Sequence, residues 1–333
     1  MKRKHGTLIT GLLKKIAVEM GVTIHLEPKW GYVGQITLPD GRKRYFRNTM
    51  LDLNSLGSAE IAADKDYTDY FLKRLGYPTI PGRAFFSTRW NKTLETDNGP
   101  KNAYAYAKAI GFPVIVKPNS LTQGAGVTKV ESREEFFAAV KRIERDDRVF
   151  LVQQLMHGHD YRIVVLDDEV ISAYERLPLT VTGDGRLTIK QLLLKKQRTF
   201  DRIGRDTQIN PQDPRITLEL KRQQLTRGSI VKKGQVVQLL TNANLSTGGD
   251  AIDATKIIHP EWKTLACTLA REMNLRYIGI DVMVQGTLET PPNDYVVIEM
   301  NAAPGLDNYV TMGKEQEQIV ERLYRKVVEA LLK

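Results

Sequence analysis

Two apolar segments late in the chain each predict a buried strand that contains an acidic residue: YIGIDVMVQG at 277–286 and YVVIEMNAAPG at 295–305. A carboxylate inside a buried strand is costly unless a cation or a hydrogen-bond donor meets it. Glu299 and Asn301 are two residues apart and so point to the same face, and a hairpin would bring Asp281 alongside. Three such oxygen ligands suit Mg²⁺ bound together with nucleotide phosphates. The alternative is that the acids bond only backbone amides.

A lysine and a glycine-containing loop form the second group with recognisable chemistry. The segment at 111–130, GFPVIVKPNSLTQGAGVTKV, predicts a buried strand that ends at Lys117, then a loop with Gly124 and Gly126, then a second strand. Such a lysine and loop can place one positive charge and several backbone N–H groups around a polyphosphate. Glycine allows the close approach of the backbone. The segment also fits an ordinary buried strand with a flexible hairpin, and it contains no Walker A motif.

The segment RVFLVQQLMHGHDYRIVVL at 148–166 predicts two strands joined by QQLM and a turn at 157–158. A linker at a strand edge can present backbone N–H and C=O groups to an adenine ring. The carboxylate of Asp160 can accept hydrogen bonds from ribose hydroxyls. Because Asp160 and Arg162 lie on the same side of the strand, a surface ion pair between them is the alternative.

The elements that would position these residues are short apolar strands alternating with amphipathic helices, a pattern typical of α/β or α+β folds. The start of the chain predicts a helix at 8–19 and a hairpin that turns at 39–41. Asp64 is expected to cap a helix that ends at Gly76. The polar stretch at 88–102 is expected to be a loop before the next helix.

These segments occur in the order and approximate spacing of the ATP-grasp ligases, which the chain resembles from about residue 58 to 310. The resemblance is carried by Lys65, Lys117, the loop at 124–126, the VQQLM linker, GID at 279–281 and EMNAAPG at 299–305. Two further segments, ERLPLTVTGDGRLTI and NANLSTGGDAIDATKIIHP, look like the ligase domain of cyanophycin synthetases and, more distantly, like bacterial glutathione synthetases. The chain has no room for the large N-terminal and Mur-ligase-like domains of cyanophycin synthetases.

The resemblance implies an α+β ATP-grasp fold in which two α/β subdomains clasp ATP. It divides the chain into a short N-terminal α/β region at 1–58, a small subdomain with a linker helix at 59–155, and a large subdomain with the metal site at 156–333. The first of these ranges has no close match in the family.

The resemblance also assigns roles to individual residues. The nucleotide would be held by Lys65, Lys117, Gly124, Gly126, Gln153, Gln154, Met156 and Asp160. Within this set the two lysines and the loop would meet the phosphates, the 153–156 linker the adenine, and Asp160 the ribose. Two Mg²⁺ ions, which Mn²⁺ could replace, would be held by Asp281, Glu299 and Asn301. The transferred phosphate and the acyl oxygen would face Arg162, Arg176, Gly248 and Gly249.

The function implied by the resemblance is an ATP-dependent carboxylate–amine ligase that forms an amide through an acyl phosphate. Its substrates would be an acid and an amine, either amino acids or a short peptide, and a homodimer stays open. One alternative is an ATP-grasp kinase of an anionic small molecule, suggested by the basic segment at 186–233. Another is a non-catalytic nucleotide-binding module, against which the complete set of metal ligands argues.

Composition limits the other classes of function. The 333 residues carry a net charge of +10, which favours anionic ligands, but the basic segment has almost no aromatic residues to stack on bases, so no nucleic-acid partner is expected. Cys267 is the single cysteine, which excludes an intramolecular disulfide and suits a reducing cytoplasm. Lys14 and Lys15 interrupt the first apolar run, and no run reaches the roughly 18 residues needed to span a bilayer. We therefore expect a cytoplasmic protein without a membrane partner.

Overall fold

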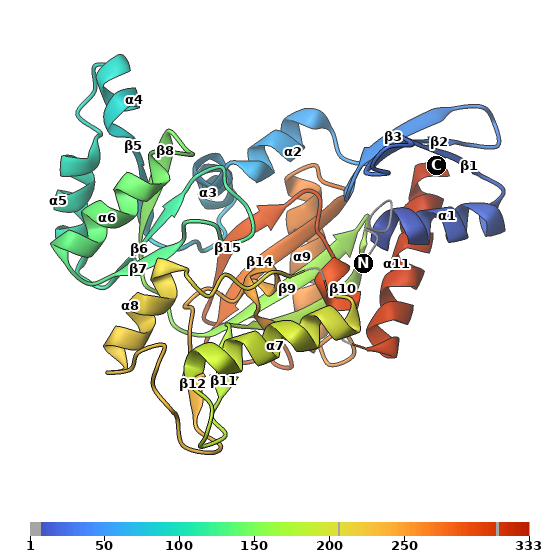
Figure 1. Cartoon of the computed structure of the whole chain (residues 1–333). Helices are drawn as coiled ribbons and strands as arrows, with labels where there is room; N and C mark the ends of the chain where they lie inside the picture. Colours follow the sequence, from blue (N-terminus) through green and yellow to red (C-terminus); the bar gives the residue numbers. More distant parts are fainter. Residues whose placement is uncertain (1–7, 206, 311–312, 333) are drawn as a thin grey trace.

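The structure is a computed structural model that describes residues 8–205, 207–310 and 313–332. Figure 1 shows three units in a row: a small sheet with its helices at one end, a five-stranded sheet in the middle and the N-terminal sheet at the other end. Helices are combined with antiparallel sheets throughout, which confirms the predicted α+β class.

The N-terminal region forms an antiparallel sheet with one helix, and the predicted helix and hairpin are both present. Its elements are α1 (Leu8–Met20), β1 (Thr23–Leu26), β2 (Val33–Thr37), β3 (Lys43–Arg47) and β4 (Met50–Leu51). Ile36 and Phe46, on the inner face of the sheet, share one hydrophobic core with α1 and with the C-terminal helix α11 (Lys314–Leu332). The two ends of the chain therefore stabilise each other.

The small unit is a sheet of order β5-β8-β6-β7 that packs against two helices. Its elements are β5 (Gly82–Phe86), α4 (Thr88–Thr93), α5 (Pro100–Ile110), β6 (Val114–Pro118), β7 (Thr128–Val130), α6 (Arg133–Ile143) and β8 (Val149–Gln154). The helix α4 lies in the stretch that the sequence predicted as a loop, and that prediction was wrong. The Ser87 hydroxyl accepts a hydrogen bond from the Trp90 N–H and caps this short helix.

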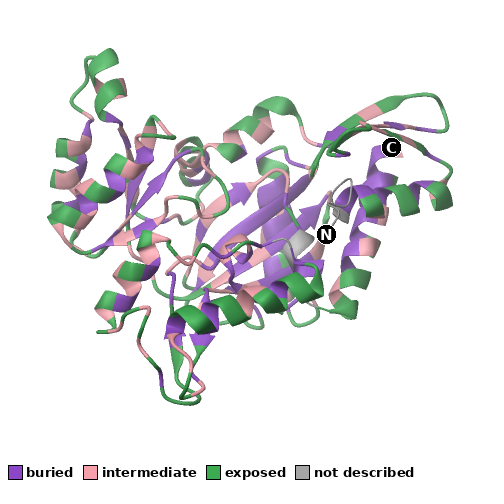
Figure 2. Cartoon of the chain, viewed as in Figure 1, coloured by how far each residue is buried: buried purple, intermediate pink, exposed green. Residues whose placement is uncertain are grey.

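The central sheet has the order β13-β10-β9-β14-β15 and is covered on both faces (Figure 2). Its elements are β9 (His159–Leu166), β10 (Glu169–Leu177), β13 (Asp250–Asp253), β14 (Tyr277–Val284) and β15 (Tyr295–Asn301), with α9 (Pro260–Glu272) and α10 (Asp307–Val310). Along β9, Ile163 packs toward α9 whereas Val164 packs toward α11. This alternation follows from the two-residue repeat of a strand.

The remaining elements connect these sheets. The linker helices are α2 (Leu56–Ala63) and α3 (Lys65–Arg74), and the Asp64 side chain accepts from the Tyr67 N–H as the predicted cap of α3. A lobe between β10 and β13 has a separate hydrophobic core. It consists of β11 (Thr180–Thr182), α7 (Ile189–Ile203), α8 (Pro214–Arg222) and β12 (Val236–Gln238), followed by the 3₁₀ turn η1 (Leu245–Thr247). No helix within the described residues is long and apolar enough to cross a membrane.

Asn54 fastens the N-terminal region to the central sheet. Its Nδ2 donates to the carbonyl oxygens of Tyr277 and Ala302 at 2.7 and 2.8 Å. Its Oδ1 accepts from the N–H groups of Arg276 and Tyr277 at 2.8 and 3.0 Å. One side chain thus satisfies four backbone groups beside the ends of β14 and β15.

We expect Asn54→Ala to lower the free energy of unfolding by roughly 2–4 kcal/mol, because several partly buried backbone groups lose their partner. Thermal unfolding followed by circular dichroism would measure the loss as a lower midpoint. Asn293→Ala is the matched control and should melt like wild type, because Asn293 is exposed and its side chain makes no hydrogen bond to the part of the chain that the structure describes. An unchanged midpoint for Asn54→Ala would contradict this role.

Candidate active site

The carboxylate of Asp281 lies at the centre of the site and has no exposed surface. The strand register places Asp281 opposite Arg162 of β9 on one side and opposite Glu299 of β15 on the other. Arg162 donates from Nε and Nη2 to the two carboxylate oxygens at 2.6 and 2.7 Å. A second guanidinium, that of Arg176 on β10, lies 2.8 Å from Oδ2. Burial acts to raise the pKa of Asp281, but Arg162 and Arg176 outweigh it and lower the pKa, so the group is a carboxylate.

Arg176 also holds a second carboxylate, the partly buried one of Asp160. Its Nε and Nη2 donate to Asp160 Oδ1 at 2.9 and 2.6 Å. Burial raises the pKa of Asp160 to about 6, and the charge of Arg176 limits the rise. Asp160, Arg176, Asp281 and Arg162 therefore form a charge network of alternating sign. The surface ion pair between Asp160 and Arg162, considered from sequence, is absent in the described structure, because each residue bonds a different partner across the sheet.

Glu299 and Asn301 lie next to this network on β15. The Glu299 carboxyl is close enough to Asp281 to affect its pKa, and Lys65 Nζ lies 3.9 Å from Glu299 Oε2. The buried Asn301 Nδ2 has no hydrogen-bond partner within the described residues. No three His, Cys, Asp or Glu side chains of the described chain converge as a metal cage. A Mg²⁺ ion here would rest on the carboxylates and the Asn301 amide and take its remaining ligands from phosphates and water, which is the usual pattern for this ion.

Two lysines stand on the side of the small sheet. Lys65, the first residue of α3, donates from Nζ to the carbonyl oxygens of Asn119 and Leu121 at 3.1 and 2.8 Å. Lys117 lies within β6, which continues one residue beyond it. Burial lowers the pKa of Lys117 to about 8, although the charge of Glu299 opposes this shift. A buried ammonium whose pKa lies this close to neutral pH is suited to bind an anionic ligand.

The loop after β6 adopts the backbone conformation that requires glycine. Gly124 and Gly126 have φ values of +69° and +73°. A Cβ atom on Gly124 would lie 2.4 Å from side-chain atoms of Asn242 and Asn244. The Gly124 carbonyl accepts from Arg215 Nη1 of α8 at 2.7 Å. The loop is therefore held against the lobe that follows β10.

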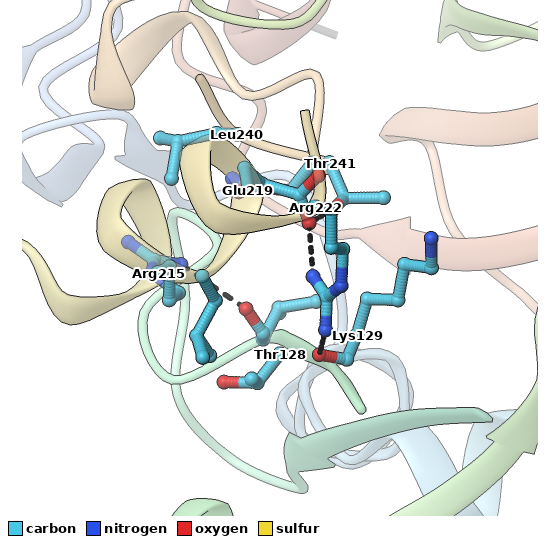
Figure 3. A pocket seen from close by; sticks show the side chains of 10 residues that line it. Thr128, Lys129, Arg215, Glu219, Arg222, Leu240 and Thr241 are labelled. Carbon is cyan, nitrogen blue, oxygen red and sulfur yellow. Dashed lines mark hydrogen bonds and ion pairs between the residues drawn. The ribbon is translucent and has the colours of Figure 1, made fainter. Parts of the chain in front are cut away.

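Helix α8 reinforces this contact about two turns further along, at Arg222. Figure 3 shows the Arg222 side chain between Glu219 and the backbone carbonyl of Lys129. Arg222 Nη2 also donates to Glu135 of α6 at 2.7 Å. The space enclosed there is only about 10 Å³, enough for one water. This region is a packed junction between the small sheet and the lobe.

A cleft of about 1710 Å³ opens in front of the charge network. Small-molecule pockets usually measure about 300–1,000 Å³, so the cleft can hold more than one small ligand. Its lining includes five predicted site residues: Lys65, Arg162, Arg176, Glu299 and Asn301. It does not include the predicted nucleotide residues Lys117, Gln153, Gln154 and Met156. The cleft therefore extends from the expected phosphate end away from the expected adenine end.

Comparison with known proteins identifies the family. Residues 71–184 match the model described as the C-terminus of D-ala D-ala ligase, and residues 229–323 match the RimK-like ATP-grasp domain. The chain belongs to the ATP-grasp superfamily. The resemblance noted from the sequence and the predicted ATP-grasp fold are both confirmed.

Two relatives illustrate the extent of the similarity. The chain is 31% identical to the cyanophycin synthetase of Geminocystis herdmanii, over 79% of the chain and 30% of the relative. It is 33% identical to the glutathione biosynthesis bifunctional protein GshAB of Pasteurella multocida, over 78% of the chain and 34% of the relative. The crystal structure of a bifunctional glutathione synthetase from Pasteurella multocida has a TM-score of 0.59 and 27% identity, and the match covers 96% of the chain and 44% of that protein. The chain thus spans less than half the length of these proteins.

In the linker expected to meet adenine in this ATP-grasp protein, the backbone groups of Gln154 and Met156 differ in their hydrogen bonding. The Gln154 N–H donates to the Pro81 carbonyl at 2.9 Å, so it is already bonded. The backbone of Met156 makes no hydrogen bond to the described part of the chain. Gln153 is buried, opposite Gly82 and Ile115 in the sheet. Met156 is therefore the better placed of the two backbone contacts that the sequence predicts.

Gly248 and Gly249 of this ATP-grasp chain lie at the edge of the central sheet. Gly248 has a φ of +102°, and a Cβ on Gly249 would lie 2.3 Å from the Leu177 carbonyl oxygen. The Gly249 carbonyl accepts from the buried Arg205 at 2.6 Å. The positive φ of Gly248 and the close packing at Gly249 account for glycine at these two positions, which lie beside Arg176. Neither glycine lines the cleft, and their predicted role near the acyl oxygen stays a prediction.

Sequence reasoning missed several residues that line the cleft. Asn244 and Ser246 reach it from the segment around η1, and Gln123 reaches it from the glycine loop. The N-terminal sheet contributes a whole wall. The resemblance around 242–260 pointed toward the first group, but no motif in the first 58 residues signalled the second.

Nucleotide affinity should depend on pH through Lys117. Bound phosphates favour the ammonium form of Lys117, whose pKa in the free protein is about 8. Above that pH the side chain must take up a proton when the nucleotide binds, so the affinity falls as the pH rises. Between pH 7 and pH 9 we expect the dissociation constant of a non-hydrolysable ATP analogue to rise by roughly tenfold, as measured by isothermal titration calorimetry. Lys117→Met should bind weakly with no such slope, whereas Lys65→Met should bind weakly and keep it. A flat profile for the wild type would be inconsistent with this assignment.

Proposed function

We propose that the chain is an ATP-dependent carboxylate–amine ligase that forms an amide bond, through an acyl phosphate, on an amino acid or a short peptide. One observation carries the proposal. The cleft joins the expected phosphate end, marked by Lys65, Glu299 and Asn301, to Arg162 and Arg176 and to a large adjoining space. A site that must hold a nucleotide, an acid and an amine together needs this combination of fixed charge and volume.

The chemistry follows from these charges. An oxygen of the substrate carboxylate attacks the γ-phosphorus of ATP, and ADP leaves. The amine then attacks the carbonyl of the acyl phosphate, loses a proton and displaces phosphate. Lys65 and Lys117 place positive charge beside the phosphates, and Arg162 and Arg176 are fixed by Asp281 where the acyl oxygen becomes negative. Bound Mg²⁺ would neutralise charge on the phosphoryl oxygens.

The relatives support a ligase over the other candidates. The matched family and relatives are named as ligases and synthetases. The kinase alternative rested on the basic segment at 186–233, but the structure uses many of those charges internally. Those with internal partners are Lys196, Arg205, Arg215, Arg222 and Arg227. The segment therefore gives no specific support to a polyanionic substrate.

The test is a phosphate-release screen of amino acids and dipeptides, offered in pairs with Mg-ATP. A ligase releases free phosphate only when a suitable acid and amine are both present, whereas a kinase transfers phosphate to one substrate without releasing it. For any active pair, an acid labelled with ¹⁸O in its carboxylate should pass one ¹⁸O atom to the released phosphate. Release without that transfer would refute the acyl phosphate, and a stable phosphorylated product would establish the kinase.

Glu299→Gln should reduce phosphate release by about 100-fold or more, because removing one charge-stabilising group commonly has this effect. The amide has nearly the same shape, so the thermal midpoint should hold. Glu289→Gln, in the exposed turn between the same two strands, is the matched control and should keep full activity. Wild-type turnover by Glu299→Gln would refute the metal assignment.

Asp281→Asn should behave differently from Glu299→Gln. It removes the buried anion that the guanidinium groups of Arg162 and Arg176 share, and breaking a buried charge pair commonly costs about 3–5 kcal/mol. We expect loss of both activity and thermal stability. Asp281→Asn therefore reports on the charge network, whereas Glu299→Gln reports on the reaction.

A further inference from the structure

The N-terminal sheet forms a wall of the cleft that no predicted site residue explains. His25, Gln35 and Tyr45 stand side by side in the strand register. They lie on the face opposite to Ile36 and Phe46, which point into the core. All three line the cleft, together with Arg47 of β3 and Asn48. A polar row across three strands therefore faces the same space as Arg162, Arg176 and Glu299.

This wall is held in a fixed place next to the expected phosphate end. Thr49 Oγ1 donates to the Ala303 carbonyl at 3.0 Å, and Asn54 Nδ2 donates to the Ala302 carbonyl at 2.8 Å. Both acceptors follow directly after Asn301, one of the expected metal ligands. The sheet therefore cannot shift without disturbing the end of β15, and it is pre-organised relative to the reacting groups.

Arg47 is the notable charge on this wall. Its neighbours Arg42 and Arg44 pair with Asp40 and Asp52. The exposed Arg47 guanidinium has no hydrogen bond or ion pair within residues 8–205, 207–310 and 313–332. A guanidinium binds a carboxylate through two parallel hydrogen bonds, which gives direction as well as charge. Arg47 is thus free to bind an acidic group of a ligand in the cleft.

The aromatic side chains beside Arg47 add a surface for flat or apolar groups. Tyr45 is 61% exposed and Tyr32 48% exposed, and both line the cleft. The Tyr45 hydroxyl accepts a hydrogen bond from Gln35 Nε2 at 2.8 Å, which fixes its direction. Exposed tyrosines offer large contact area at a low cost in side-chain entropy. Peptide planes and side chains suit such a surface.

We propose that the N-terminal sheet binds a peptide substrate, and that Arg47 holds a free carboxylate of that peptide remote from the reacting group. The inference rests on the proposed ligase function and makes it more specific. A single amino acid positioned at Arg162 and Arg176 would leave this wall unused. A dipeptide or longer substrate occupies both the reacting end and the sheet, and the cleft volume accommodates it.

The test measures binding, independently of turnover, by saturation-transfer difference NMR. The probes are a panel of di- and tripeptides with free C-terminal carboxylates and the same peptides as C-terminal amides, all with Mg²⁺ and a non-hydrolysable ATP analogue. We expect acids from the panel to bind wild type and their amides to bind at least tenfold more weakly. Arg47→Ala should lose at least tenfold for the acids only, Arg47→Lys should recover part of it, and nucleotide affinity should not change in either variant.

Lys43→Ala is the matched control, because Lys43 lies on the same strand, is exposed and does not line the cleft. It should bind every probe like wild type. The inference is overturned if no peptide binds while the nucleotide does, if acids and amides bind alike, or if Arg47→Ala behaves like Lys43→Ala. The proposed ligase function fails separately, if the wild type shows no magnesium-dependent nucleotide binding or no acid- and amine-dependent phosphate release.

Discussion

Two aspartates and two arginines alternate across β9, β10 and β14, and the rest of the site depends on their mutual neutralisation. Asp281 and Arg176 are buried, and Asp160 and Arg162 are partly buried. An isolated buried charge would cost several kcal/mol, so each of these groups is tolerated only because the others are present and well aligned. The arrangement also fixes Arg162 and Arg176 as cations at the floor of the cleft. The central sheet is therefore both the core of the fold and the support of the proposed chemistry.

The cleft connects parts of the chain that are far apart in sequence. Gln123 of the glycine loop reaches it beside the small sheet, the central sheet supplies Arg162, Arg176, Glu299 and Asn301, and the N-terminal sheet supplies a polar wall. The lobe after β10 holds the glycine loop through Arg215 and thereby closes one side of the site. Positioning of reactants and fixed charge is the means by which phosphoryl transfer is accelerated in proteins that use no nucleophilic side chain.

The basic character of the chain has a structural explanation in its lobe. Arg205, Arg215 and Arg222 satisfy backbone carbonyls and carboxylates between elements that have no shared hydrophobic core. A guanidinium can bond several acceptors at once, which suits such junctions. Excess positive charge in the sequence therefore indicates here how the lobe is attached to the small sheet and to the edge of the central sheet, and it is a poor guide to the ligand.

The sequence by itself determined the strand patterns, the cap at Asp64, the family and the ordered set of chemical groups, because these depend on local periodicity and on motifs a few residues long. It could not give the partners of the buried charges. Asp160 bonds Arg176 and Asp281 bonds Arg162 because strand register, a property of the assembled sheet, places them opposite each other. Only the tertiary structure decided that the N-terminal sheet faces the site, since its orientation is set by packing against α1 and α11 and by Asn54, whose partners are more than 200 residues away.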